Sequence, residues 1–349
     1  MGFNKKDDHV ELAHVFHGRE KKSDFDNIKY IHHSFPQMGV EDVDLTSQMA
    51  GIEMEVPFFI NAMTGGSDMT KKVNENLAIL ARECNLLMAS GSLSVAVKDP
   101  DLMDSFKIIR KTNPKGKILA NLGAEHSVEN AKRAMDALEA DGLQIHVNSI
   151  QELVMPEGDR DFSNWLGSIE KLVEEIDKPI IVKEVGFGMS KKTIDQLASI
   201  GVKTIDVGGY GGTNFAKIEN FRRDKNKYDY LEDFGQSTII SLLEAQDYMD
   251  SLEIIGSGGI RNPLDIIKVL SLGASASGVA GHILDMVLNR GLDNSIETIN
   301  NWKKELKVIM TLLGKKDIKS LTEAEFILSG NPKEWCEARN IDYRQFSNR

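Results

Sequence analysis

Short runs of consecutive apolar residues recur along the chain, each followed by Gly, Asn or Ser. Eight of them begin at Phe58, Leu86, Ile118, Gly142, Pro179, Thr204, Glu253 and Ala276. The runs are continuous rather than alternating, as in parallel strands that are buried on both faces. Between them, residues 74–84 and 127–140 carry apolar side chains on one face of a helix. The pattern predicts eight strand–helix units in succession.

Eight such units favour an α/β fold of the closed (β/α)8 TIM-barrel type. All but one of the intervals between run starts are close to the roughly 30 residues of a strand–helix unit. The alternative is an open doubly wound sheet, which has a GxGxxG turn after its first strand. The chain contains no GxGxxG, so the barrel is preferred.

The segments outside this repeat predict caps on the barrel. Residues 213–238, in the one long interval, are too polar for a barrel helix and predict a loop after the sixth strand that could act as a lid. Residues 1–57 are expected to form an N-terminal arm with a hairpin at 43–56 that plugs the barrel bottom. Residues 58–349 would form the barrel and C-terminal helices at 283–291, 297–314 and 321–330.

Composition narrows the class of protein. Hydrophobic residues make up 41% and charged residues 27% of the 349 residues, enough to bury a large core. The net charge of −11 gives no basic field for nucleic acid or an anionic membrane, so local groups must hold any phosphorylated ligand. Cys84 and Cys336 are too few for a metal cluster, and no disulfide is expected. No apolar leader or membrane-length run is present, so we expect a cytoplasmic protein.

Polar or small residues follow each predicted strand. The active site of such a barrel lies at the carboxyl ends of its strands, so these residues form the candidate site. Each could simply end a strand, but amides and hydroxyls dominate the ring as a whole. The ring comprises Asn61, Thr64, Ser92, Asn121, His146, Asn148, Lys183, Gly208, Thr213, Gly258, Gly259 and Gly281.

Two glycine-containing turns end the last two predicted strands, at residues 256–261 and 279–282. Backbone N–H groups there, with the start of a following helix, would form the phosphate site common in these barrels, because glycine lets the backbone approach phosphate oxygens. Plain turns are the alternative.

Lys183 ends a buried apolar run, where an ammonium group needs an anionic or electron-rich partner. An ion pair with Glu184 or another carboxylate is one possibility. The other is the flavin of FMN, where such a lysine stabilises negative charge on the reduced ring. Together with the glycine turns, Lys183 favours FMN as the cofactor.

Residues 146–159 crowd His146, Asn148, Gln151 and Glu152 into the fourth loop. A single carboxylate, Glu152, without His or Cys ligands beside it fits a Mg²⁺ ion that keeps waters and shares oxygens of a diphosphate. A solvated surface charge is the alternative interpretation of Glu152.

Several motifs together are similar to one enzyme family. They are KKDDHVELA (5–13), MTGG (63–66), QIHVNSIQELVMPEG (144–158), KEVGFGMS (183–190), GGTNF (211–215) and SGGIR (257–261). They resemble the type 2 isopentenyl-diphosphate isomerases over essentially the whole chain. QELVMPEG is specific to that family, whereas the glycine motifs fit several FMN barrels.

The resemblance implies a flavoprotein isomerase of isoprenoid biosynthesis that interconverts isopentenyl and dimethylallyl diphosphate. It implies reduced FMN, with NADPH as reductant, together with Mg²⁺ and a tetrameric or octameric homo-oligomer. Reduced flavin would mediate proton transfer, Lys183 would stabilise its anionic form, and Gln151 would orient or relay.

The resemblance also assigns individual residues. Glu152 would bind Mg²⁺; Lys5, Lys6 and His9 would clamp the diphosphate, and His146, Asn148 and Gln151 would line the substrate. Lys5, Ser94 and Gly208 depart from the residues usual in the family. The residues implied to hold FMN are Ala62, Met63, Thr64, Ser92, Asn121, Lys183, Gly208, Thr213, Gly258, Gly259, Arg261, Ala280 and Gly281.

Three other functions fit the same barrel. A 2-hydroxy acid oxidase would need a histidine base with arginines at the mouth, and a nucleotide dehydrogenase would need a cysteine in the sixth loop. A catalytically silent flavin-binding or assembly protein would lack Gln151, Glu152 or Lys183, and all three are present.

Overall fold

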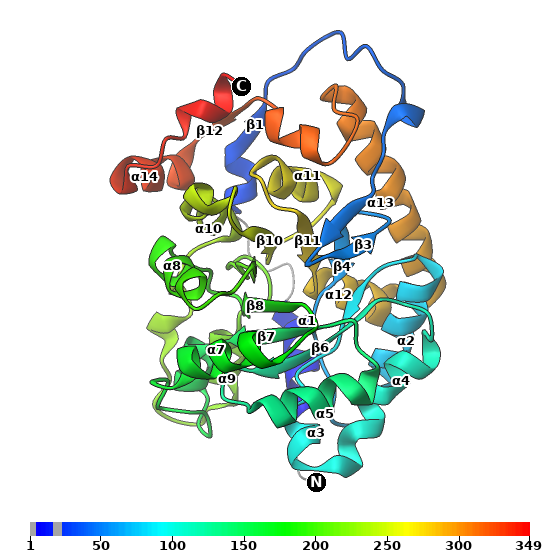
Figure 1. Ribbon diagram of the computed structural model, residues 1–349, viewed down its shortest axis with the longest axis vertical. Helices are drawn as coiled ribbons and strands as arrows, with labels where there is room; N and C mark the ends of the chain where they lie inside the picture. Colours follow the sequence, from blue (N-terminus) through cyan, green and yellow to red (C-terminus); the bar gives the residue numbers. More distant parts are fainter. Residues whose placement is uncertain (1–4, 17–22) are drawn as a thin grey trace.

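Eight parallel strands form a closed barrel in the computed structural model, which describes residues 5–16 and 23–349 (Figure 1). Neighbouring strands around the ring follow the chain order, and the last strand pairs with the first. The predicted (β/α)8 barrel is confirmed, and the open sheet is excluded. The strands are β4 (Phe58–Ile60), β5 (Met88–Ala89), β6 (Ile118–Gly123), β7 (Gly142–Val147), β8 (Ile180–Glu184), β9 (Thr204–Asp206), β10 (Glu253–Ser257) and β11 (Ala276–Val279).

Helices surround the barrel, and several begin at a side-chain cap. Ser67 accepts a hydrogen bond from the backbone N–H of Thr70, and Asn262 caps a helix that has Pro263 in its first turn. The outer helices are α2 (Asp68–Glu83), α4 (Asp104–Thr112), α5 (Val128–Leu138), α7 (Trp165–Glu175), α8 (Lys191–Ser199), α10 (Thr238–Glu244), α11 (Pro263–Ser271), α12 (Gly281–Arg290) and α13 (Leu292–Leu312). Among the described helices, none is long and apolar enough to cross a membrane.

The hairpin at the barrel bottom consists of β2 (Ser47–Met49) and β3 (Ile52–Met54), which pair antiparallel. Its buried side chains pack against Phe59, Leu119, Ile181 and Ile255 in the lower part of the barrel. The predicted hairpin is therefore present, and it continues the apolar core. The expected division of the chain at residue 57 stays a prediction.

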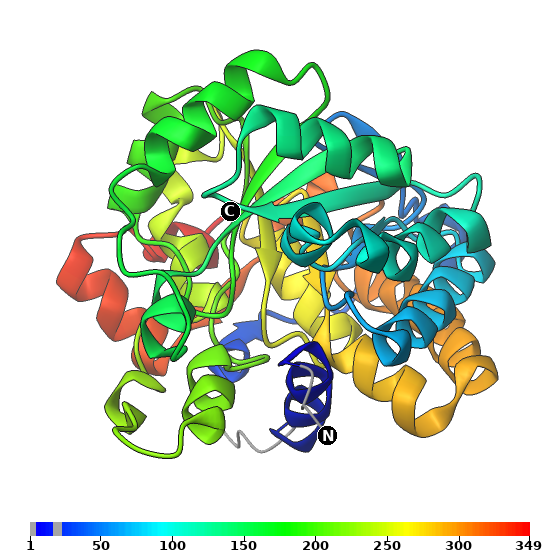
Figure 2. The same ribbon diagram turned by 90° about the horizontal axis from the view of Figure 1, so that it is seen from below.

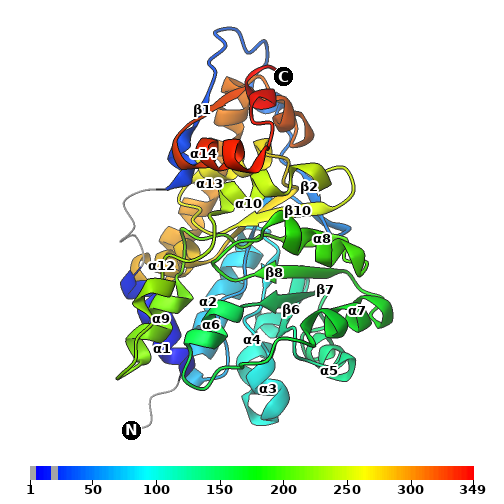
Figure 3. The same cartoon turned by 90° about the vertical axis from the view of Figure 1, so that its left-hand side faces the viewer.

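Two segments that lie far apart in the sequence meet in a small sheet. β1 (Ile28–Tyr30) pairs antiparallel with β12 (Phe326–Leu328), followed by α14 (Gly330–Arg339), as Figures 1 and 3 show. The helix predicted at 321–330 is wrong, because this segment is a 3-10 turn (Lys319–Glu323) followed by β12. Phe326 and Leu328 are buried whereas Ile327 is half exposed, and this alternation suits a strand.

Three short helices lie at the other end of the barrel, above the carboxyl ends of the strands. α6 (Ser149–Val154) follows β7, and α9 (Phe215–Arg222) lies within the long polar loop, which also contains a 3-10 turn (Asp229–Leu231). The N-terminal helix α1 (Lys5–Phe16) lies against α2, α9 and α12 (Figures 2 and 3). A further short helix, α3 (Ser94–Lys98), follows β5. The N-terminal helix and the long polar loop thus cover the barrel mouth.

Candidate active site

The interior of the barrel changes from apolar to polar toward the mouth. Directly above the apolar layer, the buried interior residues are amides, hydroxyls and charged groups: Asn61, Asn121, Gln144, Lys183, Asp206 and Ser257. Asp206 has no exposed surface and accepts hydrogen bonds from Asn61 Nδ2 at 2.8 Å and Ser257 Oγ at 2.6 Å. Burial of so many polar groups is tolerated because all but Lys183 bond one another, and Lys183 bonds the backbone oxygen of Glu184.

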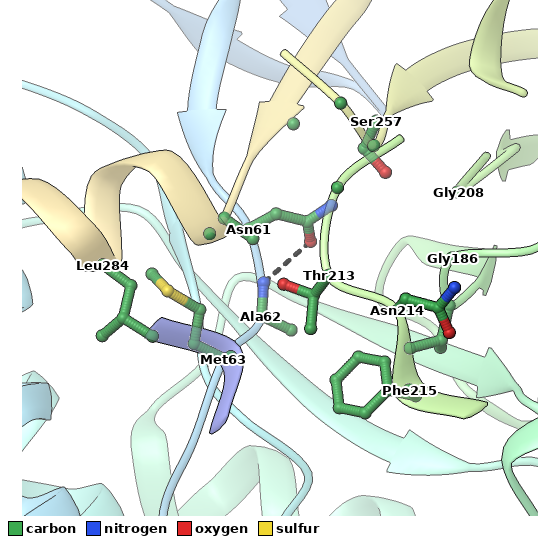
Figure 4. Close-up of a pocket in the computed structure, with 18 of the residues that line it drawn as sticks. Asn61, Ala62, Met63, Gly186, Gly208, Thr213, Asn214, Phe215, Ser257 and Leu284 are labelled. Atoms are coloured by element: carbon green, nitrogen blue, oxygen red, sulfur yellow. Dashed lines mark hydrogen bonds between the residues drawn. The ribbon is translucent and has the colours of Figure 1, made fainter. Parts of the chain in front are cut away.

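A cavity of about 240 Å³ opens above this polar layer. Figure 4 shows Asn61, Ala62 and Met63 on one side, with Thr213, Asn214 and Phe215 on the other. Its walls come from the turns after β4, β8, β9, β10 and β11, and His9, Val10 and Ala13 of α1 line its outer side. The cavity is therefore enclosed between the strand ends and the N-terminal helix.

One wall of the cavity is built from closely packed glycine turns. Gly258 has φ +101°, and a Cβ there would lie 2.0 Å from the carbonyl oxygen of Gly209. Gly259 has φ +74°, and its Cβ would lie 3.0 Å from the carbonyl carbon of Gly211. α12 begins beside them at Gly281 with Ala280 as its N-cap, so no side chain caps this helix. Bare backbone next to a helix N-terminus is suited to a phosphate group.

The hydroxyl group of Thr64 is a second feature of the cavity wall that fits a bound polar ligand. Its Oγ1 is buried in the cavity wall and makes no hydrogen bond within the described structure. A buried hydroxyl without a partner is costly unless a ligand or water bonds it. The glycine turns and Thr64 therefore fit a phosphate-bearing cofactor such as FMN.

Lys183 projects into the cavity from the end of β8 and is 6% exposed. Its Nζ donates to the backbone oxygen of Glu184 at 3.0 Å, whereas the Glu184 carboxylate accepts from Phe187 N at 2.6 Å. Burial lowers the pKa of Lys183, and the charges of Asp206 and Glu184 oppose this. In the described structure no carboxylate lies within ion-pair distance of Lys183. Its ammonium group therefore has N–H groups that can donate hydrogen bonds to a ligand.

The fourth loop brings its predicted residues into one hydrogen-bonded group. Asn148 Nδ2 donates to Gln151 Oε1 and to Glu152 Oε1, each at 3.1 Å, and Glu152 Oε2 accepts from Asp159 N at 2.9 Å. His146 bonds Asn121 instead, through Nδ1 at 2.9 Å. Burial is the main cause that lowers the pKa of His146, to about 4.

Comparison with known proteins places this site in a family. An isopentenyl-diphosphate delta-isomerase of Latilactobacillus sakei is 49% identical, over 97% of both chains. The corresponding protein of Staphylococcus haemolyticus is 47% identical over the same shares. The chain belongs to the isopentenyl-diphosphate delta-isomerase family. Residues 101–328 also match the FMN-dependent dehydrogenase family, so the chain belongs to this FMN-binding family as well.

Solved structures of other FMN-family enzymes share the fold of this isomerase-family chain. A flavocytochrome b2 variant with benzoylformate has a TM-score of 0.64 at 20% identity. The match covers 89% of this chain and 77% of the flavocytochrome b2 chain. A mandelate oxidase variant with a monooxide FMN adduct has a TM-score of 0.62 at 15% identity, over 94% of both chains. At these identities the likeness concerns the barrel alone.

Glu219, on α9, is a central residue of the site that sequence reasoning missed. It is fully buried and contacts His9 Nε2 at 2.8 Å and Gln151 Nε2 at 3.2 Å, and it pairs with Arg222. Burial alone would raise its pKa, but His9, Arg222 and Gln151 together lower it to about 2. In the sequence it is one acidic residue in a polar stretch, so nothing local distinguishes it.

The N-terminal arm of this isomerase-family chain reaches the site through several of its residues. His9 lines the cavity, Asp7 bonds Ser67, and Asp8 lies 3.8 Å from Arg222. Lys6 lies near Gly66, and its charge helps to lower the pKa of His146. Lys5 begins α1, but its side chain lies outside the described residues.

The residues implied to hold FMN fall into two groups. Those on the cavity wall are Ala62, Met63, Thr64, Lys183, Gly208, Thr213, Gly258, Gly259, Arg261, Ala280 and Gly281. Asn121 belongs to the polar layer, and Ser92 bonds Ser94 at 2.8 Å. The Arg261 guanidinium already binds Asp265 at 2.8 Å and Asp26 at 2.7 Å, so its role toward FMN stays a prediction.

Proposed function

We propose that this protein is an FMN- and Mg²⁺-dependent isomerase that interconverts isopentenyl and dimethylallyl diphosphate. The observation that supports this most is the presence of the glycine turns and Lys183 in the wall of one cavity, with Gln151 connected through Glu219 to His9, which also lines it. The chain is also 49% identical to a named isomerase. The reaction adds a proton at one carbon and removes another two carbons away, without net oxidation.

FMN would lie along the wall that includes Thr64, Gly258 and Gly259, with its phosphate near the start of α12. When bound in reduced form, FMN would supply the atoms that give and take protons. Lys183 would hold negative charge on the flavin, because its ammonium group is buried in that wall. We propose NADPH as the reductant.

Gln151 would orient the reacting alkene or pass a proton at its amide. Its Oε1 accepts from Asn148, and its Nε2 donates to Glu219, which fixes the amide in one orientation. Val10 and Ala13 of α1 close the cavity with apolar surface and would exclude water from the alkene. These residues therefore position the substrate and keep the site dry.

The diphosphate would lie between α1 and the fourth loop. Glu152 is the metal ligand in this proposal, and no cluster of three His, Cys, Asp or Glu side chains that could hold a metal occurs in the part of the chain the structure describes. Mg²⁺ would then take most of its ligands from water and from the diphosphate, as hard cations with few protein ligands do. Lys5, Lys6 and His9 would contact the remaining diphosphate oxygens, and His146 and Asn148 would line the substrate.

The test is an isomerisation assay on the FMN-loaded protein before and after reduction by NADPH or dithionite. We expect dimethylallyl diphosphate to form from isopentenyl diphosphate only after reduction and only with Mg²⁺. A parallel assay with 2-hydroxy acids separates this activity from that of the oxidases that share the barrel. Oxidation of a hydroxy acid without any isomerisation would overturn the proposal, and so would binding of FMN without either activity. Gel filtration of the same sample measures whether it is the expected tetramer or octamer.

A further inference from the structure

A chain of hydrogen bonds crosses the barrel interior from Asp206 on β9 to His146 on β7. Asn61 Nδ2 donates to Asp206 Oδ2 at 2.8 Å, and Gln144 Nε2 donates to Asn61 Oδ1 at 3.0 Å. Asn121 Nδ2 donates to Gln144 Oε1 at 3.2 Å, and Asn121 Oδ1 lies 2.9 Å from His146 Nδ1. Three amides therefore connect a carboxylate to an imidazole.

The carboxylate fixes the direction of this chain. Asp206 also receives a hydrogen bond from Gly208 N at 3.2 Å, and a backbone N–H can only donate. An ionised carboxylate only accepts, so the nitrogen of Asn61 must face it, and the oxygen of Asn61 must face Gln144. The N–H of Ala62, 2.8 Å from Asn61 Oδ1, supports the same orientation.

Each amide passes the orientation to the next one. Because an amide has one donating and one accepting end, Gln144 and Asn121 must both point their nitrogens toward Asp206. Asn121 then presents its oxygen to His146, and only a protonated Nδ1 can bond it. Asp206, Asn61, Gln144 and Asn121 are all at most 3% exposed, so water cannot readily replace a reversed partner.

We infer that Asp206 is a positioning residue that acts through Asn61, Gln144 and Asn121 to hold His146 in its Nδ1–H tautomer. Nε2 is then the ring nitrogen that can accept a hydrogen bond or take up a proton. The groups whose charges act on the ring are Glu125 and His126 after β6, Lys183 on β8 and Lys6 on α1.

The tautomer has a consequence that rests on the proposed function. A diphosphate oxygen needs a donor, and with Nδ1–H committed to Asn121, Nε2 can donate only after taking up a proton. Substrate binding would therefore be coupled to proton uptake at His146. The tautomer itself is measurable without substrate, so it can be tested even if the proposed function fails.

The experiment is nitrogen NMR of the cofactor-loaded full chain labelled with ¹⁵N-histidine. The chain has eight histidines, and His146→Gln identifies the signals of His146 by their loss. We expect the Nδ1–H form to exceed the Nε2–H form by at least about tenfold near pH 7, since reversal would lose a buried hydrogen bond. An Nε2–H tautomer in the wild-type protein would overturn the inference directly.

Variants test the route of the effect. Asp206→Asn should lower the excess of the Nδ1–H form several-fold, whereas Glu253→Gln, which alters a carboxylate at the bottom of the barrel, should leave it unchanged. In a Gln144→Leu background, which breaks the chain in the middle, Asp206→Asn should have no further effect. An equal effect of Asp206→Asn with and without Gln144, or no effect at all, would show that Asp206 does not set the tautomer.

Discussion

Glu152 is the residue whose role can be tested most simply, because its carboxylate is the proposed metal ligand. Glu152→Gln keeps the hydrogen bond from Asn148 but removes the charge. We expect activity to fall by about 100-fold or more and the Mg²⁺ requirement to weaken, with FMN content unchanged. Activity measured against Mg²⁺ concentration gives the result. Glu157→Gln, a nearby carboxylate that pairs with Arg222, serves as the control and should keep the Mg²⁺ response.

Lys183→Met tests the proposed contact with the flavin. Met fills a similar volume without a charge, so FMN affinity should fall by about 10- to 100-fold, the effect of losing one charged hydrogen bond. The flavin should also become harder to reduce. Fluorescence titration and a redox titration measure the two effects, and Lys178→Met, a lysine that bonds the backbone oxygen of Ala140, is the control. Unaltered affinity and potential would assign Lys183 a structural role only.

At the scale of residues, the sequence predicts which residues line the site better than it predicts the hydrogen bonds that connect buried side chains. Lys183, Gly258 and Thr64 can be located because they lie at or shortly after the ends of buried strands. Glu219 cannot, since its burial results from α1 and α6 packing on α9, which are contacts between distant segments. The chain of amides from Asp206 to His146 is equally invisible in the sequence, because it depends on register across four strands.

Among the elements, α1 is the one whose function is tested by removal. Deleting residues 1–9 removes the contacts of Asp7 with Ser67 and of His9 with Glu219, but the barrel remains whole. We expect the KM for isopentenyl diphosphate to rise by about tenfold or more, as for the loss of a charged contact, with FMN content and melting temperature nearly unchanged. Val15→Ser, at an exposed position of the same helix, is the control. A normal KM after the deletion would mean that the diphosphate is held elsewhere.

The β2–β3 hairpin offers a test of stability. Ala50 and Gly51 both have positive φ, at 51° and 76°, which is the turn geometry that favours Asn-Gly. Ala50→Asn should therefore raise the free energy of unfolding by about 0.5–1 kcal/mol, because Asn tolerates the left-handed conformation better than Ala. Urea denaturation measures this change. Gln48→Asn, in the adjacent strand, should not stabilise the protein.

At the scale of elements, the hydrophobic pattern predicts all eight barrel strands because each is buried on both faces. It fails at residues 321–330, where a helix is predicted and β12 is found. β12 is only three residues long and is stabilised by pairing with β1, near the other end of the chain. Local periodicity carries no information about such a distant partner.

At the scale of the whole molecule, the buried carboxylate of Glu244 on α10 connects α14 to α8. Glu244 accepts hydrogen bonds from Trp335 Nε1 and Arg339 Nε, both at 2.8 Å, and from Lys191 N at 2.8 Å. Burial raises the pKa of Glu244, but Arg339 and the other donors outweigh this effect and hold it below its ordinary value. Because its pKa is lower in the folded protein, the ionised carboxylate of Glu244 stabilises the fold above about pH 4.3. This stabilisation is lost as the pH falls below that value.

Glu244→Gln should accordingly lower the free energy of unfolding by about 1–3 kcal/mol at pH 7. The difference from the wild-type protein should shrink as the pH falls from about 5 to 3, because the wild-type carboxylate becomes protonated. Urea denaturation across this range is the measurement. A difference that does not vary with pH would mean that the charge of Glu244 does not contribute.

The pairing of β1 with β12 limits the order in which the nascent chain can fold during synthesis. Tyr30 pairs with Phe326, and Phe58 of the first barrel strand lies opposite Ser277 of the last. A ribosome adds about 5–20 residues per second, so β1 waits on the order of 15–60 s for its partner. Until the last barrel strand emerges, β4 has an unpaired edge that neighbouring nascent chains can reach. The barrel closes late in synthesis, and the small β1–β12 sheet is completed after it.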